Sequence, residues 1–141
     1  MEVKIAKSDQ EIDACFDVMK ELRTHLHQDG FCERVRSQQA DGYILAYIAD
    51  KGRVAAVAGF RKGVNLAWGN YVYIDDLVTS ETIRSKGYGK MLLEYVKSYG
   101  IENGCEQLHL DSGVQREAAH KFYEREGMFA ASLHFACLTS S

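Results

Sequence analysis

A chain of 141 residues is long enough to bury one hydrophobic core and too short for two, so we expect a single domain over residues 1–141. Its hydrophobic fraction of 46% and charged fraction of 26% are those of a globular protein, which excludes a disordered or fibrous chain. The net charge of −3 argues against a general nucleic-acid surface, and no apolar run is long enough to span a membrane.

The first forty residues predict a short strand and two helices. Residues 3–6 form the strand, and Ser8 with Glu11 forms a capping box that opens a helix running to about His27. A second short helix covers residues 32–39. Apolar side chains recur in the first helix at three- and four-residue spacing and predict one buried stripe: Ile12, Cys15, Phe16, Met19, Leu22 and Leu26.

The middle of the chain predicts three strands. Residues 43–49 and 54–60 are rich in apolar and β-branched side chains, and the Gly-containing turn at residues 50–52 predicts an antiparallel hairpin. After a loop, residues 71–79 form a further strand that is apolar except for Asp75 and Asp76.

The last third of the chain alternates helices and strands. We expect a helix over residues 89–102 that stops before Gly104, a strand over 107–110, a helix over 115–126, and one or two strands over 128–138. A strand, helix and strand in succession favour a parallel pair, whereas the earlier hairpin is antiparallel. The predicted fold is therefore α/β (α+β), a mixed sheet of six to seven strands flanked by helices on both faces.

The adjacent carboxylates Asp75 and Asp76 need an explanation, because charges in an apolar strand are costly without partners. Crowding would raise the pKa of at least one of them toward that of a useful base. Neighbouring strand residues point to opposite faces unless a bulge redirects them. The position of Asp75 favours it as the base, Asp76 is the alternative, and a structural role for both stays open.

A second candidate site is the segment that leaves this strand and enters the helix over residues 89–102. Gly87 and Gly89 let the backbone approach a ligand, and the unpaired N–H groups of a helix start suit a phosphate or diphosphate. Arg84, Lys86 and Lys90 add positive charge there. Neither the Walker spacing nor the dinucleotide G-x-G-x-x-G pattern is present.

This segment resembles motif A of the GNAT N-acetyltransferase superfamily, Q/R-x-x-G-x-G/A, on Arg84, Gly87 and Gly89. Residues 120–128, HKFYEREGM, resemble the family's F-Y-x-x-x-G-F segment, with Met128 in place of the last aromatic residue. Methionine fills a similar apolar volume, so the departure puts little in doubt. The specific motifs lie between residues 71 and 128.

The resemblance implies acetyl-CoA as co-substrate, with no metal. Backbone groups of Leu77, Val78 and Thr79 would hold the pantetheine arm, and Ser112 would touch it. Arg84 would open the loop that cradles the diphosphate, formed by Ser85, Lys86, Gly87, Tyr88, Gly89 and Lys90.

The expected reaction is direct transfer of acetyl to a primary amine of a small molecule within a ternary complex. A free alkyl amine has a pKa of about 10, so Asp75, Asp76 or a water chain must take its proton. Tyr123 would protonate the departing thiolate, and a backbone N–H near Val78 would meet the oxyanion. Packing beside Phe122 is the structural alternative for Tyr123.

Other functions stay open at this point. The acceptor amine can belong to a protein, as a lysine or an N-terminus, or the domain can be a CoA-binding sensor without turnover. We expect no nucleic-acid or membrane partner. A homodimer through the edge of the C-terminal strand is compatible with the pattern. Cytoplasmic location is expected because the start of the chain lacks the apolar stretch of a signal peptide. The four cysteines form no CxxC pair, which fits neither a zinc knuckle nor a redox motif.

Overall fold

A computed structural model describes residues 2–83 and 86–140 of the chain. The chain divides into two units, Met1–Leu110 and Asp111–Ser141. The first unit contains the sheet and most of the helices, and the second contains one helix and the C-terminal segment.

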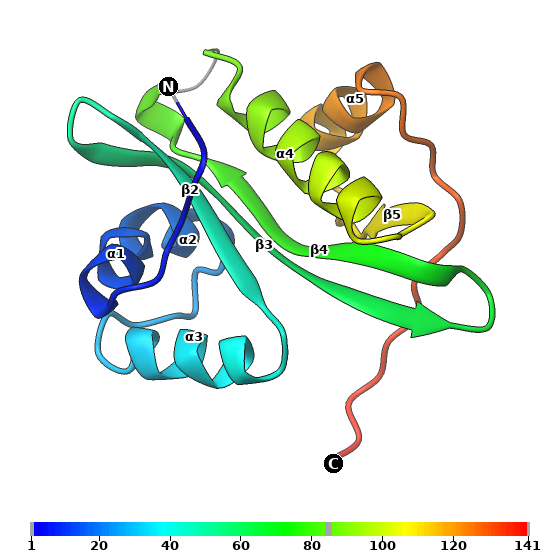
Figure 1. The fold of residues 1–141 in the computed structure, drawn as a ribbon, viewed down its shortest axis with the longest axis horizontal. Helices are drawn as coiled ribbons and strands as arrows, with labels where there is room; N and C mark the ends of the chain where they lie inside the picture. The colour runs from blue at the N-terminus through cyan, green and yellow to red at the C-terminus, as the bar shows by residue number, and fades with distance from the viewer. Residues whose placement is uncertain (1, 84–85, 141) are drawn as a thin grey trace. The chain divides into compact units, whose positions relative to one another are not determined.

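The first unit is built on a five-stranded mixed sheet with the strand order β1-β2-β3-β4-β5 (Figure 1). The first four strands pair antiparallel, and β4 pairs parallel with β5, as the alternation of elements predicted. The strands are β1 Lys4–Ile5, β2 Ile44–Asp50, β3 Arg53–Asn65, β4 Gly69–Thr79 and β5 Gln107–Leu110.

The predicted hairpin between β2 and β3 is confirmed. Asp50 pairs with Arg53, so the turn consists of two residues, Lys51 and Gly52. Both have a positive φ, 53° and 79°. Two such residues make the turn whose twist matches that of the flanking strands.

Three helices precede the hairpin: α1 Asp9–Ala14, α2 Phe16–Leu22 and α3 Phe31–Ala40. The capping box of Ser8 and Glu11 is present at the start of α1. The prediction of one helix to about His27 is wrong in two respects. The helix is interrupted at Cys15, whose N–H turns back to the carbonyl of Ile12, and α2 ends at Leu22 because Arg23 leaves helical geometry.

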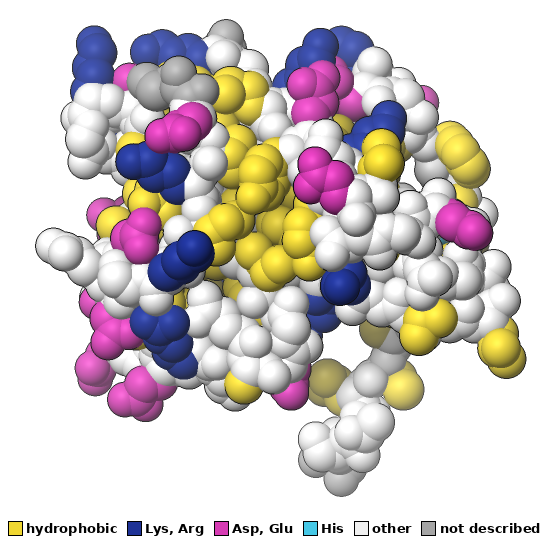
Figure 2. All heavy atoms as spheres, viewed as in Figure 1, with side chains coloured by type: hydrophobic (Ala, Val, Ile, Leu, Met, Phe, Trp, Pro, Cys, Tyr) yellow, Lys and Arg dark blue, Asp and Glu magenta, His cyan; other side chains and the backbone are white. Residues whose placement is uncertain are grey.

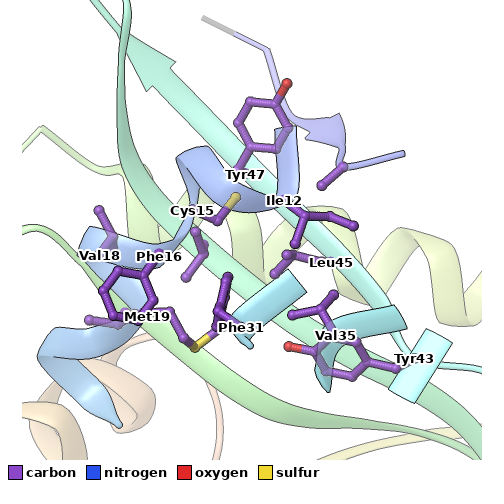
Figure 3. Close-up of a cluster of buried hydrophobic side chains, with 13 residues drawn as sticks. Ile12, Cys15, Phe16, Val18, Met19, Phe31, Val35, Tyr43, Leu45 and Tyr47 are labelled. Atoms are coloured by element: carbon purple, nitrogen blue, oxygen red, sulfur yellow. The ribbon is translucent and has the colours of Figure 1, made fainter. Parts of the chain in front are cut away.

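Helices α1 to α3 bury their apolar stripe against one face of the sheet (Figure 3). Ile12, Cys15, Phe16 and Met19 of the predicted stripe are buried, and Leu22 and Leu26 pack against them in part. The rings of Phe16 and Phe31 meet edge to face at 5.2 Å. The three-and-four spacing therefore identified the buried side of these helices correctly.

Helix α4, Tyr88–Glu102, covers the other face of the sheet (Figure 1). Gly100 lies so close to Val72 of β4 that an added Cβ would meet its side chain at 3.0 Å. At the end of the helix, the N–H of Cys105 reaches the carbonyl of Gly100 past Gly104, which has a φ of 74°. This is the glycine-based stop that the sequence predicted.

The second unit contains α5, Glu117–Arg125, close to the predicted helix over residues 115–126. Residues 128–138 carry no strand in the described part of the chain, so the one or two strands predicted there are wrong. The segment MFAASLHFACL contains no β-branched residue, and alanine and serine favour strands little.

Charged side chains of both signs surround an apolar strip over the strands on the face drawn in Figure 2. No single sign dominates this face, in keeping with the small net charge. In the described residues, no helix is both long and apolar enough to cross a membrane.

Candidate functional site

A β-bulge in β4 decides where the two adjacent aspartates point. Ile74 pairs with Phe60 and Asp76 pairs with Gly59, so Asp75 is an extra residue between them. A bulge resets the alternation of side chains along a strand. Both carboxylates consequently meet partners on the side of α2 and α3, instead of lying on opposite faces of the sheet as regular alternation predicted.

Both oxygens of the Asp76 carboxylate are occupied. Arg23 Nε donates to Oδ1 at 2.8 Å, and the hydroxyl of Tyr43 donates to Oδ2 at 2.7 Å. The Asp76 side chain is only 14% exposed, and a carboxylate buried to this degree needs such donors. Burial, together with the Asp76 charge, holds the pKa of Tyr43 well above its ordinary value, so the phenol remains a donor.

Asp75 is bound less completely. Arg61 Nε donates to its Oδ2 at 2.9 Å, and a second nitrogen of Arg61 donates to Gln38 Oε1 on α3. The Asp75 side chain is 32% exposed, and no described residue donates to its Oδ1. The two carboxylates therefore pair with different arginines, although Arg23 also donates to the backbone carbonyl of Asp75, and one carboxylate oxygen of Asp75 stays available to a ligand.

Glycine at position 59 makes this arrangement fit. Gly59 lies opposite Asp76, and a Cβ built on it would fall inside the ring of Tyr43. Glycine at this position lets the Tyr43 ring lie against the backbone of β3 and its hydroxyl reach Asp76.

The sheet opens along β4 directly after Ile74. Pairing with β5 ends at Ile74 and Leu110, whereas pairing with β3 continues to Thr79. Backbone groups of a strand alternate between its two edges, so part of the N–H and C=O groups of residues 75–79 face away from β3. Leu77, Val78 and Thr79, the predicted pantetheine contacts, lie on this segment.

The glycine-rich segment leads into the start of α4. Gly87 is the N-cap residue, with a φ of 78° and no side-chain cap on the helix. The first N–H groups of a helix have no partner within the helix. No described residue accepts a hydrogen bond from the N–H of Tyr88, Gly89 or Lys90. Arg84 and Ser85, also predicted for this site, lie outside the described residues.

The two residues on either side of Gly87 share one carboxylate. Asp50, at the end of β2, accepts from the hydroxyl of Tyr88 at 2.8 Å and from Lys86 Nζ at 3.2 Å. Asp50 is 7% exposed, and these bonds hold its pKa below the usual range. The charge of Lys86, which we expected to face an anion, is compensated by Asp50.

The second unit carries the other two predicted site residues. The Ser112 hydroxyl is buried, with no hydrogen-bond partner in the described residues. Tyr123 lies on α5 with its ring edge to face with Phe122, and burial raises its pKa above the ordinary value. Gly127, with a φ of 91°, lets the N–H of Met128 return to the carbonyl of Tyr123 and end the helix.

Four residues of the site were not predicted from the sequence to have a role there. Arg61 lies one position beyond the predicted end of its strand, and Gln38, Tyr43 and Asp50 belong to elements that were predicted without a role. The signal that was available is Gly59, because glycine inside a strand marks a bulge or a close approach. Among the described residues, no cluster of three or more side chains suits a metal ion.

Comparison with known proteins gives a family match over most of the chain. The model of the Acetyltransferase (GNAT) family matches residues 9–128. An uncharacterized N-acetyltransferase, YhdJ of Bacillus subtilis strain 168, is 35% identical over 122 residues, which is 86% of each chain. The aminoalkylphosphonate N-acetyltransferase of Salmonella typhimurium is 26% identical over 122 residues, 86% of this chain and 77% of that one.

The solved structures give the same fold. The aminoglycoside N-acetyltransferase AAC(6')-Iy in complex with CoA superposes with a TM-score of 0.83 at 15% identity. The superposition covers 99% of this chain and 96% of that one. Identity at this level shows a shared fold, which is the mixed sheet flanked by helices described above.

Proposed function

Because the chain belongs to the GNAT acetyltransferase family, we propose that it transfers the acetyl group of acetyl-CoA to a primary amine of a small molecule. The observation that carries the proposal is the start of α4, where the N–H groups of Tyr88, Gly89 and Lys90 have no described protein acceptor. Such a helix start, with its positive dipole end, suits the diphosphate of CoA.

We assign the rest of CoA to the free edge of β4. The backbone of Leu77, Val78 and Thr79 has no strand partner on that edge in the described residues, so it is free to pair with the amides of pantetheine. By resemblance to the family, Ser112 would make a further contact with this arm. Arg84 and Ser85 complete the diphosphate loop by resemblance to motif A.

Asp75 is the base of the proposed reaction. Its Oδ1 has no described donor and its side chain is partly exposed, so it is able to accept the proton of an acceptor ammonium. Asp76 has both oxygens bound by Arg23 and Tyr43, which favours a structural role for it.

The neutral amine then attacks the thioester carbon, and the oxyanion that forms takes a hydrogen bond from the N–H near Val78. Collapse of this intermediate breaks the carbon–sulfur bond, and the nitrogen releases its second proton to water as the amide forms. The thiolate of CoA takes its proton from Tyr123, whose raised pKa keeps the phenol protonated at neutral pH.

A small acceptor is favoured by the relatives. One acts on aminoalkylphosphonates by name, and a structure of the same fold belongs to an aminoglycoside N-acetyltransferase. We also place the enzyme in the cytoplasm, because all four cysteines are free thiols, as expected in a reducing compartment.

The test is thiol release from acetyl-CoA with a panel of acceptors. The panel contains ethanolamine, 2-aminoethylphosphonate, an aminoglycoside, a lysine peptide and a peptide with a free N-terminus. Turnover with a small amine, lost in Tyr123→Phe, supports the proposal. Turnover with the peptides alone would identify a protein acetyltransferase, and CoA binding without any turnover would identify a sensor domain.

A further inference from the structure

We infer that Asp50 is a positioning residue of the diphosphate site, acting through Lys86 and Tyr88 on the turn that begins α4. The inference rests on the proposed binding of CoA. Asp50 lies at the β2–β3 hairpin, far from the motif in the sequence, and touches neither of the proposed reacting groups.

The geometry makes Asp50 the anchor of this turn. One oxygen, Oδ2, accepts from both Tyr88 Oη at 2.8 Å and Lys86 Nζ at 3.2 Å. These two residues flank Gly87, whose left-handed backbone sets the direction in which the first helical N–H groups point. The N-cap supplies no side-chain hydrogen bond of its own, so the contacts with Asp50 are the described side-chain bonds that fix both sides of Gly87.

The burial of Asp50 makes the anchor strong. At 7% exposure, a carboxylate without donors would be costly, so Asp50 holds both of its partners firmly. Tyr88 is itself buried, at 6% exposure, and its hydroxyl bond lies in the interior. The start of α4 is thereby tied to the hairpin before any ligand arrives, which is the preorganisation that a backbone anion site requires.

The pairing also assigns the roles of the charges near the anion. Because Asp50 compensates Lys86, the diphosphate meets backbone N–H groups in place of the Lys86 ammonium. We therefore expect Lys86→Met, which removes one of the two bonds to Asp50, to weaken CoA binding by a few-fold, whereas Asp50→Ala, which removes both, weakens it by about tenfold or more.

The experiment compares two acetyl donors that differ in the diphosphate. Acetyl-CoA contains it, and S-acetylpantetheine lacks it. In Asp50→Ala we expect the ratio of kcat/KM for acetyl-CoA to kcat/KM for S-acetylpantetheine to fall about tenfold. Tyr88→Phe, which removes one of the two bonds and leaves the carboxylate paired with Lys86, should lower the ratio by a few-fold.

The matched control is Asp9→Ala. Asp9 also forms an ion pair, at 2.7 Å, but its partner is Arg36 on α3 and not a residue at the start of α4. This variant should leave the donor ratio unchanged. If Asp50→Ala and Tyr88→Phe lower both donors equally, Asp50 is merely structural and the inference is wrong. If Asp50→Ala does not fold, Tyr88→Phe alone decides by the same ratio. If the wild-type protein shows no CoA binding at all, the proposed function fails instead.

Discussion

Asp75 and Asp76 are neighbours in the sequence, yet the structure gives them different chemical surroundings. Asp76 is nearly buried and saturated by Arg23 and Tyr43, whereas Asp75 keeps one free oxygen and about a third of its surface. A base must exchange a proton with a ligand, and a structural carboxylate must not. The two residues should therefore respond differently to the same substitution.

We predict that Asp75→Asn lowers kcat/KM by roughly 10²–10⁴, the range of general base catalysis. Asp76→Asn should instead destabilise the fold by about 1–3 kcal/mol, because it disrupts the bonds from Arg23 and Tyr43. Steady-state kinetics and urea unfolding of both variants separate these effects.

Asp9→Asn is the control for this pair, because its carboxylate is 76% exposed and an exposed ion pair contributes little to stability. A stable Asp76→Asn variant that has lost its activity, together with a fully active Asp75→Asn variant, would contradict these assignments and make Asp76 the base.

The residue types of the site were predictable from the sequence, but their contacts were not. Asp75, Asp76 and Gly87 stand out because charge in an apolar strand and glycine before a helix are unusual locally. Arg61 and Asp50 do not stand out, since an arginine or aspartate near a strand end is common. Their roles depend on partners 14 and 38 positions away along the chain, which only the folded sheet brings near.

At the scale of elements, the start of α1 couples a helix cap to the sheet. Glu11 accepts from the backbone N–H groups of Ser8 and Lys7, and also from the hydroxyl of Tyr47 on β2 at 2.7 Å. These bonds, that of Ser8 first, lower the pKa of Glu11 from 4.5 to about 2. Protonating Glu11 therefore opposes folding.

The sign of the pH effect follows from this lowered pKa. The stabilisation by Glu11 is fully present above pH 4.5 and is lost as the pH falls toward 2. We expect Glu11→Gln to be less stable than the wild type at pH 6 and equally stable near pH 2, as measured by urea unfolding. Glu33 is exposed on α3, so the stability difference between Glu33→Gln and the wild type should not change in this way with pH. A loss of stability in Glu11→Gln that is the same at every pH would contradict this account.

The β3–β4 pair makes a second prediction at this scale. Gly59→Ala should destabilise the protein by about 1–3 kcal/mol, because the new methyl group must displace the Tyr43 ring. In a Tyr43→Ala background the same change should cost much less. A double-mutant cycle by chemical unfolding measures this coupling, and additive losses would show that the ring is not what the methyl group meets.

Most elements were predictable because each has a strong local signal. The capping box, the glycine-containing hairpin turn and the glycine stop of α4 all act within a few residues, and all are present, although the turn is one residue shorter than predicted. Two features were not predictable in this way. The interruption at Cys15 leaves the apolar spacing intact. The bulge is marked in the sequence only by Gly59 on the facing strand, which does not tell that Asp75 is the extra residue.

At the scale of the whole molecule, the family motifs and the order of elements predicted the type of fold correctly, but they did not predict the number of strands. The sheet has five strands in the described residues instead of six to seven, because residues 128–138 form none. The mixed pairing, which opens the sheet beyond Ile74, was correct and is what the proposed CoA site requires.

The most direct test of the account is calorimetric titration of CoA into the wild-type protein and Gly89→Trp. We predict that the wild type binds CoA at one site. In Gly89→Trp, the indole would occupy the approach to the helix start. The variant should bind about a hundredfold more weakly, as expected for two lost bonds to a charged group at about 1.5 kcal/mol each. Glu94→Trp, which adds the same bulk at an exposed position of α4, should bind like the wild type. Equal affinity of the wild type and a folded Gly89→Trp would contradict the diphosphate site.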